Sequence, residues 1–412
     1  MKVNIINHSD SFGGASRAAY RIHKSLLNID VESTMIVNIK NTDEWSIRGP
    51  EKKIKQLTLP IWSALSTLIA KKFQKSLNKN LHSISIFNSN IINDINSSNV
   101  DLVNLHWING EMLSISDISK INKPIVWTFH DMWPFCGSEH YTDSNRWIEG
   151  YYKDNRPNGD SGIDIDKWVW KRKFRNWTTP FHIVTPSNWL ANCVRKSKLM
   201  SHFPITVIHN PIDINFWKPI NKETARNILN LPLSKKYLLF GGIKGSKDIR
   251  KGIDLLINAI FKLKNNNIFD LEILIYGEST PKIQDDIGFP VTYFGHLHDD
   301  ISLRLLYSVS DVMIIPSRQD NLPNTGVESL ACGTPVVSFN IGGMSDIVNH
   351  LKTGYLAIPF NTDDLANGIS WVLKNNTDGV LSYNSRIYAE QNFSYEVVSK
   401  QYFDVYKKVT NI

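Results

Sequence analysis

Short apolar runs alternate with amphipathic helical patterns along almost the whole chain, and this alternation restricts the folds open to it. Short runs rich in valine, isoleucine and leucine predict strands, whereas apolar residues spaced three and four apart predict helices. The predicted strands are Lys2–Asn7, Ser33–Val37, Leu102–Leu105, Ile125–Phe129, His182–Thr185, Thr206–His209, Lys236–Phe240, Leu271–Tyr276, Val291–Phe294, Val312–Ile315 and Pro335–Phe339. Helices are predicted between them, for example over Ser16–Leu27, Ile253–Lys264, Ile301–Ser308 and Thr325–Ala331. Such alternation predicts an α/β fold, with parallel sheets covered by helices on both faces.

A break in this pattern separates two series of strands and helices. It runs from His209 to Pro219 and contains two prolines, which punctuate the chain. We therefore predict an N-terminal Rossmann-like domain of residues 1–212 and a C-terminal one of residues 213–394. A last helix, about residues 395–412, is expected to pack back on the first domain. Two parallel sheets that face each other would enclose a central cleft, where such sheets bind ligands.

The composition is that of a globular protein, with 42% hydrophobic and 21% charged residues among 412. The three cysteines lie far apart and form no CxxC pair, which argues against a disulfide framework or a zinc site. The longest candidate for a membrane span, about Leu57 to Ala70, contains Pro60 and is shorter than the ~20 apolar residues a span needs. We expect a cytoplasmic chain that does not cross the bilayer.

Positive charge is concentrated in two stretches. Residues 51–80 carry seven lysines and one glutamate, around an apolar stripe of Trp62, Leu65, Ile69 and Phe73. Such a helix either lies on an anionic membrane surface or docks its stripe on the domain core. Residues 167–177 carry five cations and no acid, but no recognition fold accompanies them, so no nucleic-acid partner is expected.

In the N-terminal half, two strand ends carry candidate site residues. Gly13 and Gly14 lead from the first strand into a helix, where backbone amides can approach an anion, although a tight turn alone would also use glycine. His130 and Asp131 follow the strand Ile125–Phe129. A histidine there can hydrogen-bond a ligand hydroxyl or carry a proton, but an isolated histidine is often structural.

The C-terminal half carries a basic loop after its first strand. Lys244, Lys247, Arg250 and Lys251 follow a glycine pair, so the loop is either a diphosphate clamp or a solvated basic segment.

A second loop places two carboxylates, Asp320 and Glu328, with seven residues between them. A loop carboxylate suits sugar hydroxyls, and one inside the following helix suits ribose hydroxyls. The amides around Asn324 and Thr325 open that helix and can meet phosphate. The same loop adds Asn321 and Leu322 to the candidate donor-binding residues.

Residues 316–337 and 342–348 resemble the C-terminal signature of glycosyltransferase family 4, a retaining family with the GT-B fold. There an acid-x7-acid motif precedes an AxGxPVV strand and a GGxxE-like turn. Supporting segments follow in the expected order: Gly13-Gly14, Thr128–Asp131, Ser187-Asn188-Trp189, Asn210–Asp213, Lys251-Gly252 and Phe294-Gly295. Residues 130–135 also resemble a subgroup associated with bacterial surface-polysaccharide assembly.

The resemblance implies a GT-B fold and transfer of a sugar, with retained configuration, from a nucleotide-diphosphate donor. A UDP-sugar is favoured and a GDP-sugar is the alternative. The implied acceptor is a saccharide on a polyprenyl lipid, and neither a cofactor nor a metal is expected. Within the family pattern, Glu328 should hold the ribose, Asp320 and His130 the donor sugar, and Lys251 the leaving diphosphate. Gly14 should face the phosphates or the acceptor.

Three departures from the family pattern matter. The first acid is usually glutamate and here is the shorter Asp320, and Gly242 stands where a phosphate-binding arginine usually lies. Lys244, Lys247 and Arg250 are candidates to replace that charge. Residues 132–177 form a long connection for which we expect acceptor contact. The DxD string Asp164–Asp166 is interpreted as a helix N-cap.

Two other functions fit parts of the sequence. A catalytically silent sugar-nucleotide-binding partner subunit would share the fold, although it would not need Lys251, Asp320 and Glu328 together. A GT-B-type sugar-nucleotide epimerase would need more acid-base residues than His130 and Asp131. A nicotinamide enzyme is disfavoured because neither half has the full dinucleotide fingerprint.

Overall fold

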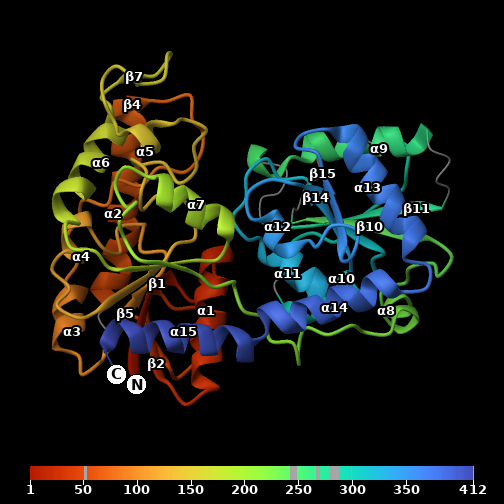
Figure 1. Cartoon of the computed structure of the whole chain (residues 1–412), viewed down its shortest axis with the longest axis horizontal. Helices are drawn as coiled ribbons and strands as arrows, with labels where there is room; N and C mark the ends of the chain where they lie inside the picture. Colours follow the sequence, from red (N-terminus) through yellow and green to blue (C-terminus); the bar gives the residue numbers. More distant parts are fainter. Residues whose placement is uncertain (51–52, 242–247, 266–269, 278–286, 298, 412) are drawn as a thin grey trace. The chain divides into compact units, whose positions relative to one another are not determined.

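The computed structural model describes residues 1–50, 53–241, 248–265, 270–277, 287–297 and 299–411. It divides into two compact units, drawn in Figure 1. Unit 1 is Met1–His209 with Val398–Ile412, and unit 2 is Asn210–Val397. The boundary lies a few residues before the one predicted from sequence.

Unit 1 is built on a seven-stranded sheet in the order β3-β2-β1-β5-β6-β8-β9, in which every pairing is parallel. Its strands are β1 (Lys2–Ser9), β2 (Glu32–Ile39), β3 (Ile47–Arg48), β5 (Leu102–Leu105), β6 (Ile125–Thr128), β8 (His182–Thr185) and β9 (Ile205–Val207), and a separate antiparallel pair joins β4 (Gln74–Lys75) to β7 (Ser161–Gly162). Its helices are α1 (Gly14–Leu27), α2 (Lys53–Phe73), α3 (Ile91–Ser97), α4 (Ile115–Ile118), α5 (Arg146–Glu149), α6 (Ile165–Asn176) and α7 (Asn188–Lys196).

Unit 2 is built on a six-stranded parallel sheet in the order β12-β11-β10-β13-β14-β15. The strands are β10 (Lys236–Gly241), β11 (Leu271–Tyr276), β12 (Val291–Tyr293), β13 (Val312–Ile315), β14 (Val336–Phe339) and β15 (Gly354–Ala357). The helices are α8 (Lys222–Ile228), the 3-10 turn η1 (Ile249–Lys251), α9 (Ile253–Asn265), α10 (Asp300–Val309), α11 (Asn324–Ala331), α12 (Met344–Ile347), α13 (Thr362–Asn375) and α14 (Val380–Phe393).

The predicted parallel α/β architecture is confirmed, and the predicted strands agree with the observed ones to within two residues at each end. The two-residue strands β3, β4 and β7 were not predicted, and neither was the edge strand β15. It has only four residues, and just Gly354 and Ala357 are buried, so it lacks the apolar run that marks the other strands.

The last helix, α15 (Tyr395–Thr410), packs on unit 1 from Val398 onward (Figure 1). Asn104 on β5 donates to the Tyr406 hydroxyl at 2.7 Å, and the hydroxyls of Tyr402 and Thr128 lie 3.1 Å apart. The two tyrosines are four residues apart and therefore lie on one helix face. Both are fully buried, so this face completes the core of unit 1.

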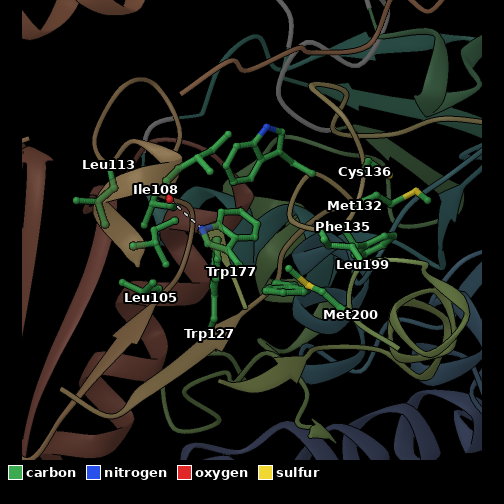
Figure 2. Packing of buried hydrophobic residues seen from close by; sticks show 14 of the residues in the cluster. Leu105, Ile108, Leu113, Trp127, Met132, Phe135, Cys136, Trp177, Leu199 and Met200 are labelled. Atoms are coloured by element: carbon green, nitrogen blue, oxygen red, sulfur yellow. Dashed lines mark hydrogen bonds between the residues drawn. The ribbon is translucent and has the colours of Figure 1, made fainter. Parts of the chain in front are cut away.

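A second core cluster of unit 1 is rich in aromatic residues, as Figure 2 shows around Trp127 and Trp177. The two indoles meet edge to face, with ring centroids 5.2 Å apart. Trp133 joins them, and the fully buried Lys173 lies over its ring and donates to the carbonyls of Trp133, Cys136 and Gly137. Much of the connection 132–177, for which acceptor contact was expected, thus builds the core.

The DxD string starts α6 as predicted. Asp164 accepts a hydrogen bond from the backbone N–H of Lys167 at 3.0 Å and therefore caps the helix. Its carboxylate also pairs with both terminal nitrogens of Arg146, at 3.2 and 2.6 Å. Asp164 is thus fully used in holding this part of the fold together.

Within the basic stretch, Lys53–Phe73 forms the predicted helix, α2, but its apolar residues are only partly covered. Ile69 packs against the core of unit 1, whereas Trp62 and Leu65 are 42% and 39% exposed. Ile61 and Leu68 are more exposed still, at 61% and 63%. The side chains of residues 53–60 and 71, and all of residues 51–52, lie outside the described part of the chain.

Candidate active site

In unit 2 the candidate residues gather where the parallel strands end. The carboxyl ends of β10, β13 and β14 lie at the same edge of the sheet, because parallel strands point the same way. The turn before α9 is pressed against the loop after β13. Gly252 has φ of +66°, and a Cβ there would lie 2.0 Å from the carbonyl oxygen of Pro316, so the contact requires glycine.

This close contact brings Lys251 onto Asp320. Lys251 Nζ lies 2.7 Å from Asp320 Oδ2, and the same oxygen lies 3.3 Å from the Ser317 hydroxyl. Burial alone would raise the pKa of Asp320, but the charge and hydrogen bond of Lys251, with Arg250 nearby, hold that pKa below its ordinary value. Asp320 is therefore an anion near neutral pH and suits ligand hydroxyls as an acceptor.

The backbone fixes the Asp320 loop on both sides. The N–H of Asn321 donates to Asp320 Oδ1 at 3.1 Å, and the N–H of Gly343 donates to the Asp320 carbonyl at 3.1 Å. The two motifs that the sequence separates, the acidic pair and the glycine turn, therefore meet at this loop.

Glu328 lies in the buried interior of the same edge, on α11. The hydroxyl of Tyr307 donates to Glu328 Oε2 at 2.9 Å, and the hydroxyl of Tyr276 lies 2.8 Å from that of Tyr307. Both Glu328 and Tyr307 are buried. This chain of hydroxyls orients the Glu328 carboxylate, and neither tyrosine was singled out from the sequence.

The first turn of α11 follows directly from this loop. Asn210 Nδ2 lies 3.4 Å from both the Leu322 carbonyl and Asn324 Oδ1, which fixes the entry to the helix. The N-cap, Pro323, makes no side-chain hydrogen bond to the helix. Thr325 occupies the first turn, as predicted. Leu322, a candidate donor-binding residue, has its side chain in the core of unit 2, so only its backbone is available for a ligand.

The cations of the basic loop have different surroundings. Arg250 pairs with Asp248 at 2.6 Å, so its charge is already partly neutralised. Arg318, which sequence analysis passed over, pairs with Asp254 in bidentate fashion at 2.8 and 2.6 Å. Lys244 and Lys247 lie outside the described residues. Of the predicted cations that the structure describes, Lys251 pairs with a predicted site acid, Asp320.

In unit 1, Gly13 and Gly14 lie where predicted, between β1 and α1. Gly13 caps the helix with φ of +90° and ψ of 164°, and no atom lies within 4 Å of where its Cβ would be. The loop before it is held by Asp10, whose carboxylate accepts from Thr42 N–H and hydroxyl at 2.9 and 2.8 Å. Hydrogen bonds therefore hold the loop before the turn in place, and the space beside the Gly13 α-carbon is open.

His130 lies at the end of β6 beside a second histidine, His106, at the end of β5. His106 Nδ1 lies 3.0 Å from His130 Nε2. Burial lowers the pKa of His130 to about 4, although Asp131 opposes the shift, and burial with His130 nearby holds the pKa of His106 well below its ordinary value. Both rings are neutral near pH 7, so one donates a hydrogen bond to the other.

Asp131 is buried and surrounded by donors. His140 Nδ1 lies 2.6 Å and Trp107 Nε1 3.2 Å from Oδ2, and the Trp133 N–H donates to Oδ1 at 3.0 Å. Burial alone would raise the pKa of Asp131, but His140 and these hydrogen bonds hold it below its ordinary value. Such a carboxylate orients its neighbours and is a weak base.

Sequence analysis missed two tyrosines for one reason. Tyr276 and Tyr307 lie within apolar strand and helix patterns and have the local pattern of core residues. Only the packing of separate elements shows that Tyr307 meets Glu328 and that Tyr276 meets Tyr307. His106, which was also missed, directly follows β5 and so shares a strand-end signal with His130.

Among the described residues, no helix combines the length and apolarity needed to cross a membrane. Two protein-family models match the chain one after the other. Residues 12–216 match the model described as Glycosyltransferase Family 4, and residues 235–375 match the model described as Glycosyl transferases group 1.

Proteins with similar sequences are also named as glycosyltransferases. An uncharacterized glycosyltransferase of Methanocaldococcus jannaschii is 29% identical over 288 residues, which cover 66% of this chain and 69% of the relative. A D-inositol 3-phosphate glycosyltransferase of Mycobacterium marinum is 27% identical over 206 residues, which cover 47% of this chain and 42% of the relative. The match thus spans less than half the length of that second relative.

Solved structures agree over nearly the whole chain. The Anabaena protein HepE, in complex with UDP and glucose, superposes with a TM-score of 0.65 at 16% identity, covering 98% of this chain and 99% of that one. WaaG, a glycosyltransferase involved in lipopolysaccharide biosynthesis, gives a TM-score of 0.57 at 13% identity, covering 98% and 99%. At such low identity these likenesses bear on the fold alone. Taken with the family matches and the paired parallel sheets, they show that the chain belongs to glycosyltransferase family 4 and has the GT-B fold.

Proposed function

We propose that this glycosyltransferase transfers a sugar, with retained configuration, from a nucleotide-diphosphate sugar to a saccharide acceptor. The observation that carries the proposal is the group of side chains at the strand ends of unit 2. There Lys251 pairs with Asp320, the Gly343 N–H donates to the Asp320 carbonyl, and Tyr307 donates to Glu328. A carboxylate for the sugar, a buried carboxylate for the ribose and a cation for the diphosphate are the three recognition elements that such a donor needs.

Each residue has a proposed role. Glu328, oriented by Tyr307, accepts from the ribose hydroxyls, and Asp320 accepts from hydroxyls of the transferred sugar. The backbone of Asn321 and Leu322 lines the loop, while Asn324 and Thr325 present the start of α11 to phosphate.

We propose that electrostatic stabilisation of the leaving group makes the largest contribution to lowering the activation free energy. Negative charge develops on the diphosphate as the glycosidic bond breaks, and cations and helix amides placed in advance stabilise that charge. Lys251 supplies one such charge, and Lys244, Lys247 and Arg250 remain candidates for the second. This mechanism needs no metal or cofactor at the donor.

Unit 1 is proposed to contribute His130, with Asp131 and Gly13–Gly14. The neutral His130 ring can exchange hydrogen bonds with a sugar hydroxyl, and Asp131 holds its surroundings through His140 and Trp107. Gly13, with open space at its α-carbon, lets a phosphate or an acceptor hydroxyl approach the start of α1.

We favour UDP as the nucleotide, with GDP as the alternative. HepE has been solved with UDP and with UDP-glucose, and it shares the fold over nearly the full length. This supports a uridine donor without identifying the sugar.

The acceptor is proposed to be a lipid-carrier-linked oligosaccharide in bacterial surface-polysaccharide synthesis. The subgroup resemblance at residues 130–135 supports it, as does the fold likeness to a lipopolysaccharide enzyme. Unit 1 would then work beside the cytoplasmic face of a membrane. The exposed apolar side chains of Ile61, Trp62 and Leu68, with the exposed Lys72, suit the surface of an anionic bilayer.

The donor proposal is tested by a thermal-shift screen with UDP, GDP, ADP, CMP and their sugar conjugates. At about 100 times the dissociation constant, a ligand adds ~2.7 kcal/mol of stability, which moves the midpoint visibly. One nucleotide class should raise the midpoint, and Glu328→Ala should abolish the rise. Hydrolysis of the bound donor without acceptor would separate an enzyme from a silent partner subunit.

The membrane proposal is tested by co-sedimentation with liposomes containing anionic lipid. Binding should fall on replacing Lys52, Lys53, Lys71 and Lys72 together, and also in the double variant Ile61→Ser, Leu68→Ser. Tyr383→Ser, which alters an exposed ring of unit 2, is the control and should bind as the parent does. Binding that survives both sets of changes refutes the surface-helix model.

A further inference from the structure

Three ionisable side chains from distant parts of the sequence meet inside unit 1. His82 precedes α3, Glu139 lies in the connection after β6, and Asp166 lies in the first turn of α6. The backbone forms an antiparallel bridge between His82 and Glu139, which sets their side chains beside each other. None of the three has a role in the proposed sugar transfer.

The spacing of their polar atoms is that of metal ligands. One nitrogen of His82 and one oxygen from each carboxylate all lie within 4.8 Å of one another, and His82 Nδ1 lies 3.3 Å from Asp166 Oδ1. In a tetrahedral zinc site with bonds of about 2.1 Å, two ligand atoms lie roughly 3.4 Å apart. Small side-chain movements would therefore bring all three atoms onto one ion.

Neighbouring groups already orient each prospective ligand. His82 Nε2 lies 3.3 Å from the carbonyl oxygen of Asn78, which favours a proton on Nε2 when the ring is neutral. The Tyr151 hydroxyl donates to Glu139 Oε1, and the Ser138 hydroxyl donates to Asp166. Metal-bound histidines and carboxylates are held in the same way by a second layer of hydrogen bonds.

One oxygen of the cluster has no donor. Glu139 is only 3% exposed, and its Oε2 accepts no hydrogen bond. The carboxylate of Asp166 lies beside it. Two buried carboxylates set against each other need either a shared proton or a cation between them.

Gly137 provides the room for this arrangement. A Cβ at that position would lie 2.6 Å from Glu139 Oε2 and 2.7 Å from the Cα of Asp166. His82 Nδ1 lies 2.8 Å from the Ser138 hydroxyl, a contact that a bound ion would replace.

We propose that His82 Nδ1, Glu139 Oε2 and Asp166 bind one divalent metal ion, with Zn²⁺ as the best match to one imidazole and two carboxylates. Water would fill the fourth position. The absence of a CxxC pair does not bear on such a site, because it uses no cysteine. Its role is structural: the ion would tie the segment before α3 and the start of α6 to the connection between them. Binding displaces any proton held on Nδ1 or Glu139.

The metal content of the full chain, purified without chelator, tests this directly. Mass spectrometry should find about one Zn²⁺ per chain, and EDTA should remove it and lower the melting temperature. Co²⁺ added to the stripped protein should give visible absorption bands of a tetrahedral site. These readouts do not depend on glycosyl transfer, so they can fail while the proposed function stands.

Variants separate a metal from a shared proton. Glu139→Gln mimics a protonated carboxyl, so a proton-sharing pair should tolerate it, whereas a metal site should lose both its Zn²⁺ and its response to EDTA. Glu149→Gln, an exposed change nearby, is the matched control and should keep both. If Glu139→Gln does not fold, the Co²⁺ spectrum of the stripped parent protein still decides. No metal and no Co²⁺ bands in the parent, or metal retained by Glu139→Gln, would overturn the proposal.

Discussion

The hydroxyl of Tyr307 offers a sharp test of how the ribose-binding carboxylate is held. Tyr307→Phe removes the donor that lies 2.9 Å from Glu328 Oε2, and it also removes the hydroxyl partner of Tyr276 at 2.8 Å. The ring itself stays, so the packing around it changes little.

The size of the effect follows from the kind of hydrogen bond lost. A hydrogen bond to a charged group contributes about 1.5–3 kcal/mol, and 1.4 kcal/mol is a tenfold change in an equilibrium constant. If Glu328 binds ribose only in the orientation that Tyr307 imposes, nucleotide affinity should fall at least ~10-fold. The unfolding free energy of unit 2 should also fall, by about 2 kcal/mol.

Calorimetric titration with the nucleotide identified by the thermal screen gives the affinity, and a thermal melt without ligand shows that the variant is folded. Tyr237→Phe is the control, because its hydroxyl donates to the carbonyl of Pro232 at 2.9 Å and meets no site carboxylate. Unchanged nucleotide affinity in Tyr307→Phe, or an equal loss in Tyr237→Phe, would refute the reasoning.

Three further predictions concern the same two units. Lys251→Met should lower kcat by roughly 100-fold, since one cation facing the leaving group is removed; initial-rate assays on the folded variant check this, and a loss confined to KM would contradict it. Gly252→Ala should destabilise unit 2 by at least ~1 kcal/mol, because φ is +66° and the added Cβ meets the Pro316 carbonyl; denaturant melts measure it, and a parent-like midpoint would count against the contact. Burial lowers the pKa of His23 to about 4. Between pH 6.5 and pH 4 the histidine is therefore protonated in the unfolded state but not in the folded state. Up to about 3 kcal/mol of stability is lost as the pH falls through this range. Melts across this range should show the loss, and His23→Gln should reduce the slope; the same slope in both proteins would exclude His23 as its source.

Much of the site could be located from the sequence because its chemistry is written in short, local segments. The acid pair Asp320 and Glu328, with seven residues between, lies where strand β13 and helix α11 were predicted, and both acids lie near the expected edge of the sheet. Strand ends need only local patterns to be found, since burial on both faces demands continuous apolar runs. His130 and Gly13 were predicted by the same logic, and they lie after β6 and before α1 as expected.

Other parts could not be found because they depend on contacts between segments far apart in sequence. Tyr307 on α10 donates to Glu328, and Tyr276 on β11 contacts the hydroxyl of Tyr307. Each tyrosine has the local pattern of a core residue. Arg318 was not among the predicted cations, and its bidentate pairing joins it to Asp254, which lies 64 residues earlier in the chain.

The sequence by itself therefore determined the α/β class, most strand positions and the residue types at the strand ends, because these follow from periodicity and from where parallel strands point. Tertiary structure alone decided which polar groups meet. It placed Lys251 on Asp320 through the glycine contact at Gly252, and it brought His82, Glu139 and Asp166 together from three segments. The physical reason is the sequence distance over which each feature is specified. A strand or helix is specified by a few neighbouring residues, whereas side chains from distant segments meet only when the core packs those segments together.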